Sequence, residues 1–134
     1  MDKNTITFVC EHGAAKSIVA SAYFNKLAAE DGLRIRSIAR GTHPDAEISQ
    51  NAIIGLRADG LFPGESIPQK LTHSDVESAH YIVTFCELPE DYQQKAPTES
   101  WDDVPAVSDG YEAARDAIVR HIEKLIEQLD HEER

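Results

Sequence analysis

The residues best suited to chemistry are a cysteine and the short loop that follows it. Cys10 ends a short β-branched run, and residues 10–17 are Cys-Glu-His-Gly-Ala-Ala-Lys-Ser, after which an apolar-periodic segment begins. A thiol held between a strand and a helix lies among backbone N–H groups, which stabilise a thiolate and bind a tetrahedral oxyanion. This arrangement predicts nucleophilic chemistry on phosphate or on an anion of similar shape.

The segments that must position this loop alternate between strand and helix patterns. Short apolar runs predict strands at residues 5–9 and 81–85, and alternating polar and apolar residues predict another strand at 34–39. Helix patterns follow at residues 15–29, at 49–60, in a short helix starting at the capping box of 72–75, and from 109–112 onwards. The alternation predicts an α/β fold with an open parallel sheet, which binds ligands beyond the strand C-termini. Cys10 and Cys86 both follow strands, so we expect them at the same edge.

A long irregular segment separates the third predicted strand from the last helix. Residues 87–107 contain three prolines and Trp101, the only tryptophan of the chain. Loops of this length in compact domains are usually functional or mobile. We expect Trp101 either to fill the core under this segment or to form a wall of a substrate cleft.

The composition of the chain limits the classes of binding partner that are expected. The chain has 134 residues and a formal net charge of −11, which fits one domain and disfavours nucleic acid and anionic membranes as partners. Neither a secretory signal nor an apolar run of about 20 residues is present, so a cytoplasmic location is expected. The spacing of the two cysteines indicates no disulfide framework. No metal or other cofactor is expected, and histidines 43, 73, 80, 121 and 131 are predicted to be surface residues.

The chain resembles the low-molecular-weight protein tyrosine phosphatase superfamily, which includes the thiol-dependent arsenate reductases. The similar features are Cys10, five residues, the basic Lys16 and then Ser17, followed by the turn at 41–42, the strand at 81–86 and the acidic segment at 101–105. The resemblance extends over residues 1–134 as one domain. It implies a three-layer sandwich around an open parallel sheet of about four strands.

The resemblance also implies roles for individual residues. Cys10 would attack phosphorus or arsenic, while Lys16 would supply positive charge. Asp103, or alternatively Asp102, would protonate the leaving oxygen and then activate water. Backbone N–H groups of the loop would hold the oxyanion, which makes these residues substrate-binding: Glu11, His12, Gly13, Ala14, Ala15 and Ser17.

Several positions depart from the family pattern. Lys16 stands where the family has arginine, and Gly13 where it usually has a bracing asparagine. Glu11 adds a carboxylate beside the nucleophile, which His12 offsets when protonated. A valine separates Asp103 from the following proline.

Three functions follow from these observations. The first is hydrolysis of a phosphomonoester, with phosphotyrosine as one candidate, through a cysteinyl-phosphate on Cys10; a phosphorylated small molecule or protein would be the substrate. The second is arsenate reduction, with Cys86 as a redox partner, although no third cysteine follows it. The third is a weakly active or regulatory module that binds phosphate, arsenate or a similar oxyanion.

Overall fold

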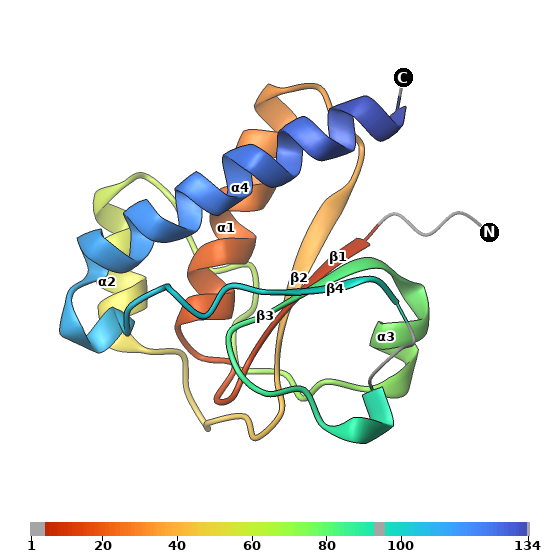
Figure 1. Ribbon diagram of the computed structural model, residues 1–134. Coiled ribbons are helices and arrows are strands. Elements are labelled where there is room, and N and C mark those ends of the chain that lie inside the picture. Colours follow the sequence, from red (N-terminus) through yellow and green to blue (C-terminus); the bar gives the residue numbers. More distant parts are fainter. Residues whose placement is uncertain (1–4, 93–95, 134) are drawn as a thin grey trace.

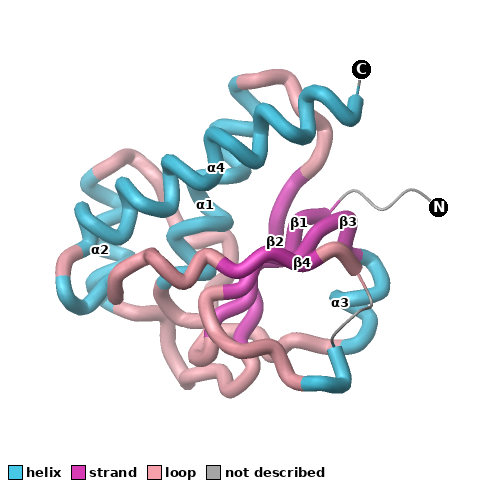
Figure 2. Tube along the Cα trace, in the orientation of Figure 1, coloured by secondary structure: helices cyan, strands magenta, loops and turns pink. Residues whose placement is uncertain are grey.

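The computed structural model describes residues 5–92 and 96–133, and a four-stranded sheet lies at its centre (Figure 2). The strands are β1 (Thr5–Cys10), β2 (Arg36–Gly41), β3 (Ala79–Thr84) and β4 (Thr98–Ser100). They lie in the order β2-β1-β3-β4, and each neighbouring pair is parallel. The predicted parallel sheet of about four strands is therefore confirmed. Because the order reverses between β1 and β3, a crevice is expected beyond their C-terminal ends.

Helices cover both faces of the sheet (Figure 1). One face packs against α1 (Lys16–Glu30), α2 (Gln50–Ala58) and α4 (Tyr111–Glu133), and the other against α3 (His73–Ser78). Side chains of β1 alternate between the two layers, since Ile6 and Phe8 belong to the first core cluster and Val9 to the second. Burial on both faces explains why the central strands are nearly continuous apolar runs. The three-layer sandwich implied by the sequence is thus confirmed.

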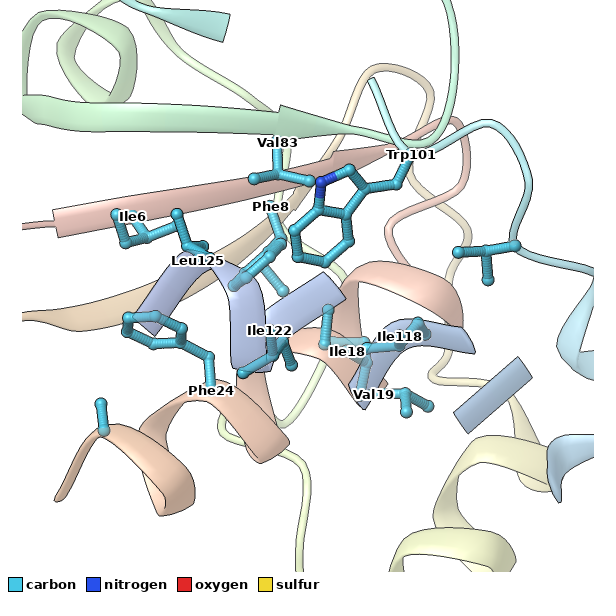
Figure 3. Close-up of a cluster of buried hydrophobic side chains, with 14 of the residues drawn as sticks. Ile6, Phe8, Ile18, Val19, Phe24, Val83, Trp101, Ile118, Ile122 and Leu125 are labelled. Atoms are coloured by element: carbon cyan, nitrogen blue, oxygen red, sulfur yellow. The ribbon is translucent and has the colours of Figure 1, made fainter. Parts of the chain in front are cut away.

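Trp101 fills the larger core and does not line the cleft. Its side chain is 1% exposed, and its ring centroid lies 5.6 Å from that of Phe8 and 5.8 Å from that of Phe85. Figure 3 shows the indole ring between β1 and the apolar side chains of α1 and α4. The first of the two alternatives for Trp101 is therefore correct.

Two features of the later half of the chain differ from expectation. The fourth strand lies within the segment that was predicted to be irregular. It was not predicted because its three residues are polar, exposed at the edge of the sheet and without an apolar pattern. His121 was expected at the surface without a partner. Its ring instead stacks on Trp101 at 4.6 Å, and its Nε2 lies 2.7 Å from Asp103 Oδ1.

Within residues 5–92 and 96–133, no helix combines the length and apolarity that a bilayer crossing requires. The same part of the chain contains no group of three or more His, Cys, Asp or Glu side chains placed to hold a metal ion.

A polar cluster joins three helices at the end of α2. Asp59 Oδ2 accepts hydrogen bonds from the hydroxyls of Tyr23 on α1 and Tyr111 on α4, the latter at 2.8 Å. Arg115 on α4 approaches Asp59 Oδ1 at 3.2 Å. Burial raises the pKa of Asp59, but the three donors outweigh burial and hold that pKa below its usual range. The ionised carboxylate is therefore the form that ties α1, α2 and α4 together.

The cluster predicts an acid-dependent contribution to stability. A carboxyl whose folded pKa is depressed stabilises the fold above its unfolded pKa of about 3.9, and this contribution is lost as the pH falls through the folded pKa. Asp59→Asn should cost about 1–3 kcal/mol at pH 7, and less at pH 3. Urea unfolding of both proteins at the two pH values tests this, with the exposed Glu127→Gln as control. A cost for Asp59→Asn that does not change with pH would contradict it.

Candidate active site

The two cysteines lie at one cavity at the C-terminal edge of the sheet. Cys10 is the last residue of β1, and Cys86 lies two residues beyond the end of β3. The two strands stay paired up to this edge, where Phe85 N donates to Val9 O at 2.8 Å. A cavity of 310 Å³ opens here, lined by both cysteines, by much of the loop after β1 and by residues 106–108. The edge predicted from the sequence therefore holds both thiols.

The loop after β1 is held in place from outside by the segment that follows β2. Four carbonyls of the loop accept hydrogen bonds from backbone N–H groups of this segment, at 2.7–3.2 Å: Thr42 N to Cys10 O, His43 N to Glu11 O, Asp45 N to His12 O and Ser49 N to Ala14 O. These bonds supply a backbone brace for the loop. They satisfy these four carbonyls of the loop.

Close contact between two glycines makes this brace possible. Gly13 has a φ of +62°, and a Cβ added to Gly41 would lie 2.7 Å from Gly13 N and 2.8 Å from Gly13 Cα. Contacts that short do not occur between real Cβ atoms and backbone, so the two segments approach only because both residues lack side chains.

Gly41→Ala should therefore destabilise the protein by about 1–3 kcal/mol, because backbone rather than a flexible side chain must move. Gly64→Ala is the matched control, since a Cβ there meets nothing within 4 Å. Urea unfolding of the two variants measures the difference. Equal midpoints for both would contradict the close packing of these glycines.

The N-terminus of α1 is left without a side-chain cap where it faces the cavity. Ala15 occupies the N-cap position and makes no capping hydrogen bond, whereas Ser49 caps α2 and Thr72 forms a capping box with Asp75 at α3. No acidic residue lies in the first turn of α1. Free N–H groups and the positive end of the helix dipole are thus available to an anion.

Ser17 and Lys16, at the start of α1, belong to the same site as Cys10. The buried Ser17 places Oγ 3.0 Å from Cys10 Sγ, which is hydrogen-bonding distance to sulfur. Lys16 lines the cavity together with Cys10. Glu11, His12, Ala14 and Ala15 also line the cavity, whereas Gly13 and Ser17 do not.

Cys86 differs from Cys10 in its surroundings. Burial, followed by the nearby Cys10, raises the pKa of the Cys86 thiol to about 11, although Thr42 acts in the opposite direction. Cys86 is consequently a protonated thiol near neutral pH. Attack on another sulfur requires a thiolate, so this thiol is poorly activated as a redox partner.

Charged side chains gather at the mouth of the cavity. His12 Nδ1 lies 3.1 Å from Asp45 Oδ1, and His12 Nε2 lies 3.5 Å from Glu11 Oε2. All three side chains are more than half exposed, and all three residues line the cavity. The Glu11 carboxylate is therefore engaged by His12 at the rim.

The two aspartates predicted as general acids are not brought to this cavity. Neither Asp102 nor Asp103 lines it, although residues 106–108 of the same segment do. Asp103 is directed towards α4, where His121 holds it, and its side chain is 64% exposed. The hydrogen bond from His121 keeps the pKa of Asp103 below its usual range.

A larger cavity of 530 Å³ lies between α2 and the start of α4, and it shares Val107 and Ser108 with the first. Its lining contains no cysteine, histidine or lysine. The smaller cavity, with a thiol, an imidazole and an ammonium group, is better suited to chemistry.

Sequence reasoning missed Asp45 and the wall formed by residues 106–108. Asp45 could have been found, because it follows a strand that ends at the same sheet edge as Cys10. Residues 106–108 are Ala-Val-Ser, which carry no sequence signal for a site.

A comparison with models of known protein families gives one match. The family model described as "Low molecular weight phosphotyrosine protein phosphatase" matches residues 5–134. No curated protein matches the chain by sequence.

Solved structures show the same fold at low sequence identity. YfkJ from Bacillus subtilis superposes with a TM-score of 0.86 at 18% identity, over 100% of this chain and 99% of that one. A protein tyrosine phosphatase from Entamoeba histolytica with Hepes in its active site gives 0.79 at 21%, over 97% and 99%. A thioredoxin-dependent arsenate reductase from Corynebacterium glutamicum gives 0.71 at 21%, over 96% of this chain and 62% of that one.

Proposed function

Because the chain belongs to the low molecular weight phosphotyrosine protein phosphatase family, we propose that it hydrolyses phosphomonoesters, with aryl phosphates such as phosphotyrosine as candidate substrates. One observation carries the proposal: the Cys10 thiol lies beside Ser17 Oγ, at the uncapped start of α1, in a cavity of 310 Å³. A nucleophile and an anion site thus coincide in a space large enough for a phosphoryl group and part of its leaving group.

The reaction has two steps at this cavity. Cys10 attacks phosphorus as a thiolate, the S–P bond forms, and the P–O bond to the leaving group breaks. The N–H groups of residues 11–17 hold the equatorial oxygens, and Lys16 balances part of their charge. Water then attacks the cysteinyl-phosphate, which releases inorganic phosphate and the Cys10 thiolate. Ser17 stabilises that thiolate by donating a hydrogen bond from its hydroxyl to Sγ.

Turnover of an aryl phosphate by the wild-type protein between pH 5 and 8 tests the proposal. We expect release of the phenol, with inorganic phosphate as a competitive inhibitor because it occupies the same N–H groups. Absence of turnover over this whole range would refute hydrolysis. Phosphate binding by calorimetry without turnover would leave an oxyanion-binding module as the function.

A second candidate, arsenate reduction, is favoured by the presence of both thiols in one cavity. Arsenate would first form an S–As bond to Cys10 with loss of water; the Cys86 thiolate would then attack Cys10 Sγ, so that the S–S bond forms, the S–As bond breaks and its electron pair stays on arsenic, which leaves as arsenite. An external dithiol would reduce the Cys10–Cys86 disulfide again. The raised pKa of Cys86 slows this route, so it ranks second. Arsenite production in the presence of dithiothreitol, compared between wild type and Cys86→Ala, tests it; equal rates would show that Cys86 takes no part.

A further inference from the structure

The proposed hydrolysis needs a proton donor for the leaving oxygen, and the late acidic segment does not supply one at the cavity. Asp103 Oδ1 is bound to His121 Nε2 at 2.7 Å on α4. The same segment contributes Ala106, Val107 and Ser108 to the cavity wall. With its pKa held low by His121, the Asp103 carboxyl is ionised at neutral pH and has no proton to give.

One imidazole occupies the cavity mouth instead. His12 follows Cys10 by two residues, and both line the same cavity. Asp45 Oδ1 lies 3.1 Å from His12 Nδ1, so this carboxylate orients the ring as the aspartate does in a Ser-His-Asp triad. The other ring nitrogen, Nε2, faces Glu11 Oε2 at 3.5 Å, which is longer than a normal hydrogen bond, and it is the nitrogen available to exchange a proton. Histidine changes charge near neutral pH, which suits general acid–base work.

The position of His12 is fixed from the backbone as well. Asp45 N donates to His12 O at 2.9 Å, so both the main chain and the side chain of His12 are tied to the segment after β2. The other charged or titratable groups of the cavity wall are Glu11, Lys16, Cys86 and Cys10 itself. Lys16 is already assigned to the phosphoryl charge, and Cys86 is a half-buried thiol with a raised pKa.

We propose that His12, oriented by Asp45, donates the proton that the leaving oxygen takes when Cys10 attacks the phosphoryl group. This inference rests on the proposed function. In the first step the S–P bond forms, the P–O bond breaks, and the electron pair left on oxygen takes the proton from His12 Nε2. In the second step the neutral imidazole accepts a proton from the attacking water, the S–P bond breaks, and the Cys10 thiolate leaves. His12 therefore returns to its starting state after each cycle, and Asp45 acts as its positioning residue.

A series of aryl phosphates with leaving groups of increasing basicity tests the assignment. The value of kcat/KM is measured from 2,4-dinitrophenyl phosphate to phenyl phosphate, because a proton donor matters most for the poorest leaving group. His12→Gln should reduce kcat/KM by less than about 3-fold for dinitrophenyl phosphate and by about 100-fold for phenyl phosphate.

Two further variants distinguish the orientation of His12 by Asp45 from a general loss of activity caused by substitution. Asp45→Asn should also lose more activity on the poorer leaving groups. Its kcat/KM on phenyl phosphate should fall by about 10-fold, compared with about 100-fold for His12→Gln. His131→Gln, at an exposed histidine near the end of α4, should match wild type throughout. Phosphate inhibition constants check that the anion site of each variant is intact.

An equal loss on all substrates in His12→Gln would overturn the assignment, as would a steep leaving-group dependence in Asp103→Asn but not in His12→Gln. Failure of the wild type to hydrolyse even dinitrophenyl phosphate would refute the proposed function itself. If the wild type turns over these substrates but His12→Gln loses the same factor in kcat/KM on every leaving group, only the role of His12 is refuted.

Discussion

Replacing Cys10 by serine is expected to lower aryl phosphate turnover by about 10⁴-fold or more, as removal of a hydrolase nucleophile does. A serine hydroxyl is nearly fully protonated at neutral pH and needs an adjacent base. The side chain in contact with position 10 is the hydroxyl of Ser17, 3.0 Å from Sγ, which is not a base. The loop N–H groups and Lys16 are unchanged in this variant. Phosphate binding should therefore stay close to the wild-type value while turnover disappears.

Cys86→Ser is the matched comparison, because it changes the other thiol of the same cavity. Under hydrolysis, water resolves the cysteinyl-phosphate, so this variant should retain most of the turnover. Steady-state release of phenol by the two variants gives the contrast. Comparable turnover by Cys10→Ser and the wild type would contradict the role of Cys10, and a similar loss in both variants would favour a two-thiol mechanism.

The second large effect is expected at Lys16. A guanidinium holds two equatorial oxygens in a planar fork, whereas an ammonium is a compact point charge. Lys16→Arg should therefore raise kcat/KM by about 100-fold, the scale of gaining one oxyanion donor. Because Lys16 starts α1 and lines the cavity, the longer side chain can reach the anion from the same position.

Lys124→Arg makes the same change at an exposed position of α4 and should have no effect. The measurement is kcat/KM on one aryl phosphate for the three proteins. If Lys16→Arg and the wild type have the same kcat/KM, the ammonium group of Lys16 does not contact the phosphoryl oxygens. If Lys16→Arg gains activity as expected, the natural lysine limits the rate of hydrolysis.

Sequence patterns predicted the elements whose signals are local. The apolar strand before Cys10, the helix after Lys16 and the capping box at Thr72 are each specified by neighbouring residues, and the structure contains all three. The strand β4 has no such signal, since Thr98–Ser100 is short, polar and at the sheet edge. Its position follows from pairing with β3, which is a tertiary interaction.

The parts of the site that depend on local sequence could also be predicted. Cys10 and Cys86 could be placed at one edge because parallel strands end there together. The orientation of Asp103 could not, because it depends on His121, which lies 18 residues away on α4. The brace between the loop and residues 42–49 consists of backbone hydrogen bonds, which leave no side-chain pattern in the sequence. Long-range contacts therefore account for what the sequence alone did not predict.

Catalysis is expected to pass through a phosphoryl group on Cys10. The most direct test is rapid denaturation of the protein during turnover of dinitrophenyl phosphate, followed by mass spectrometry of the peptides. We predict one phosphoryl group on the peptide that contains Cys10, at Sγ, and none on the peptide that contains Cys86. A protein that turns over substrate while the phosphoryl group resides on another residue, or with no phosphorylated peptide at any time, would contradict the claim.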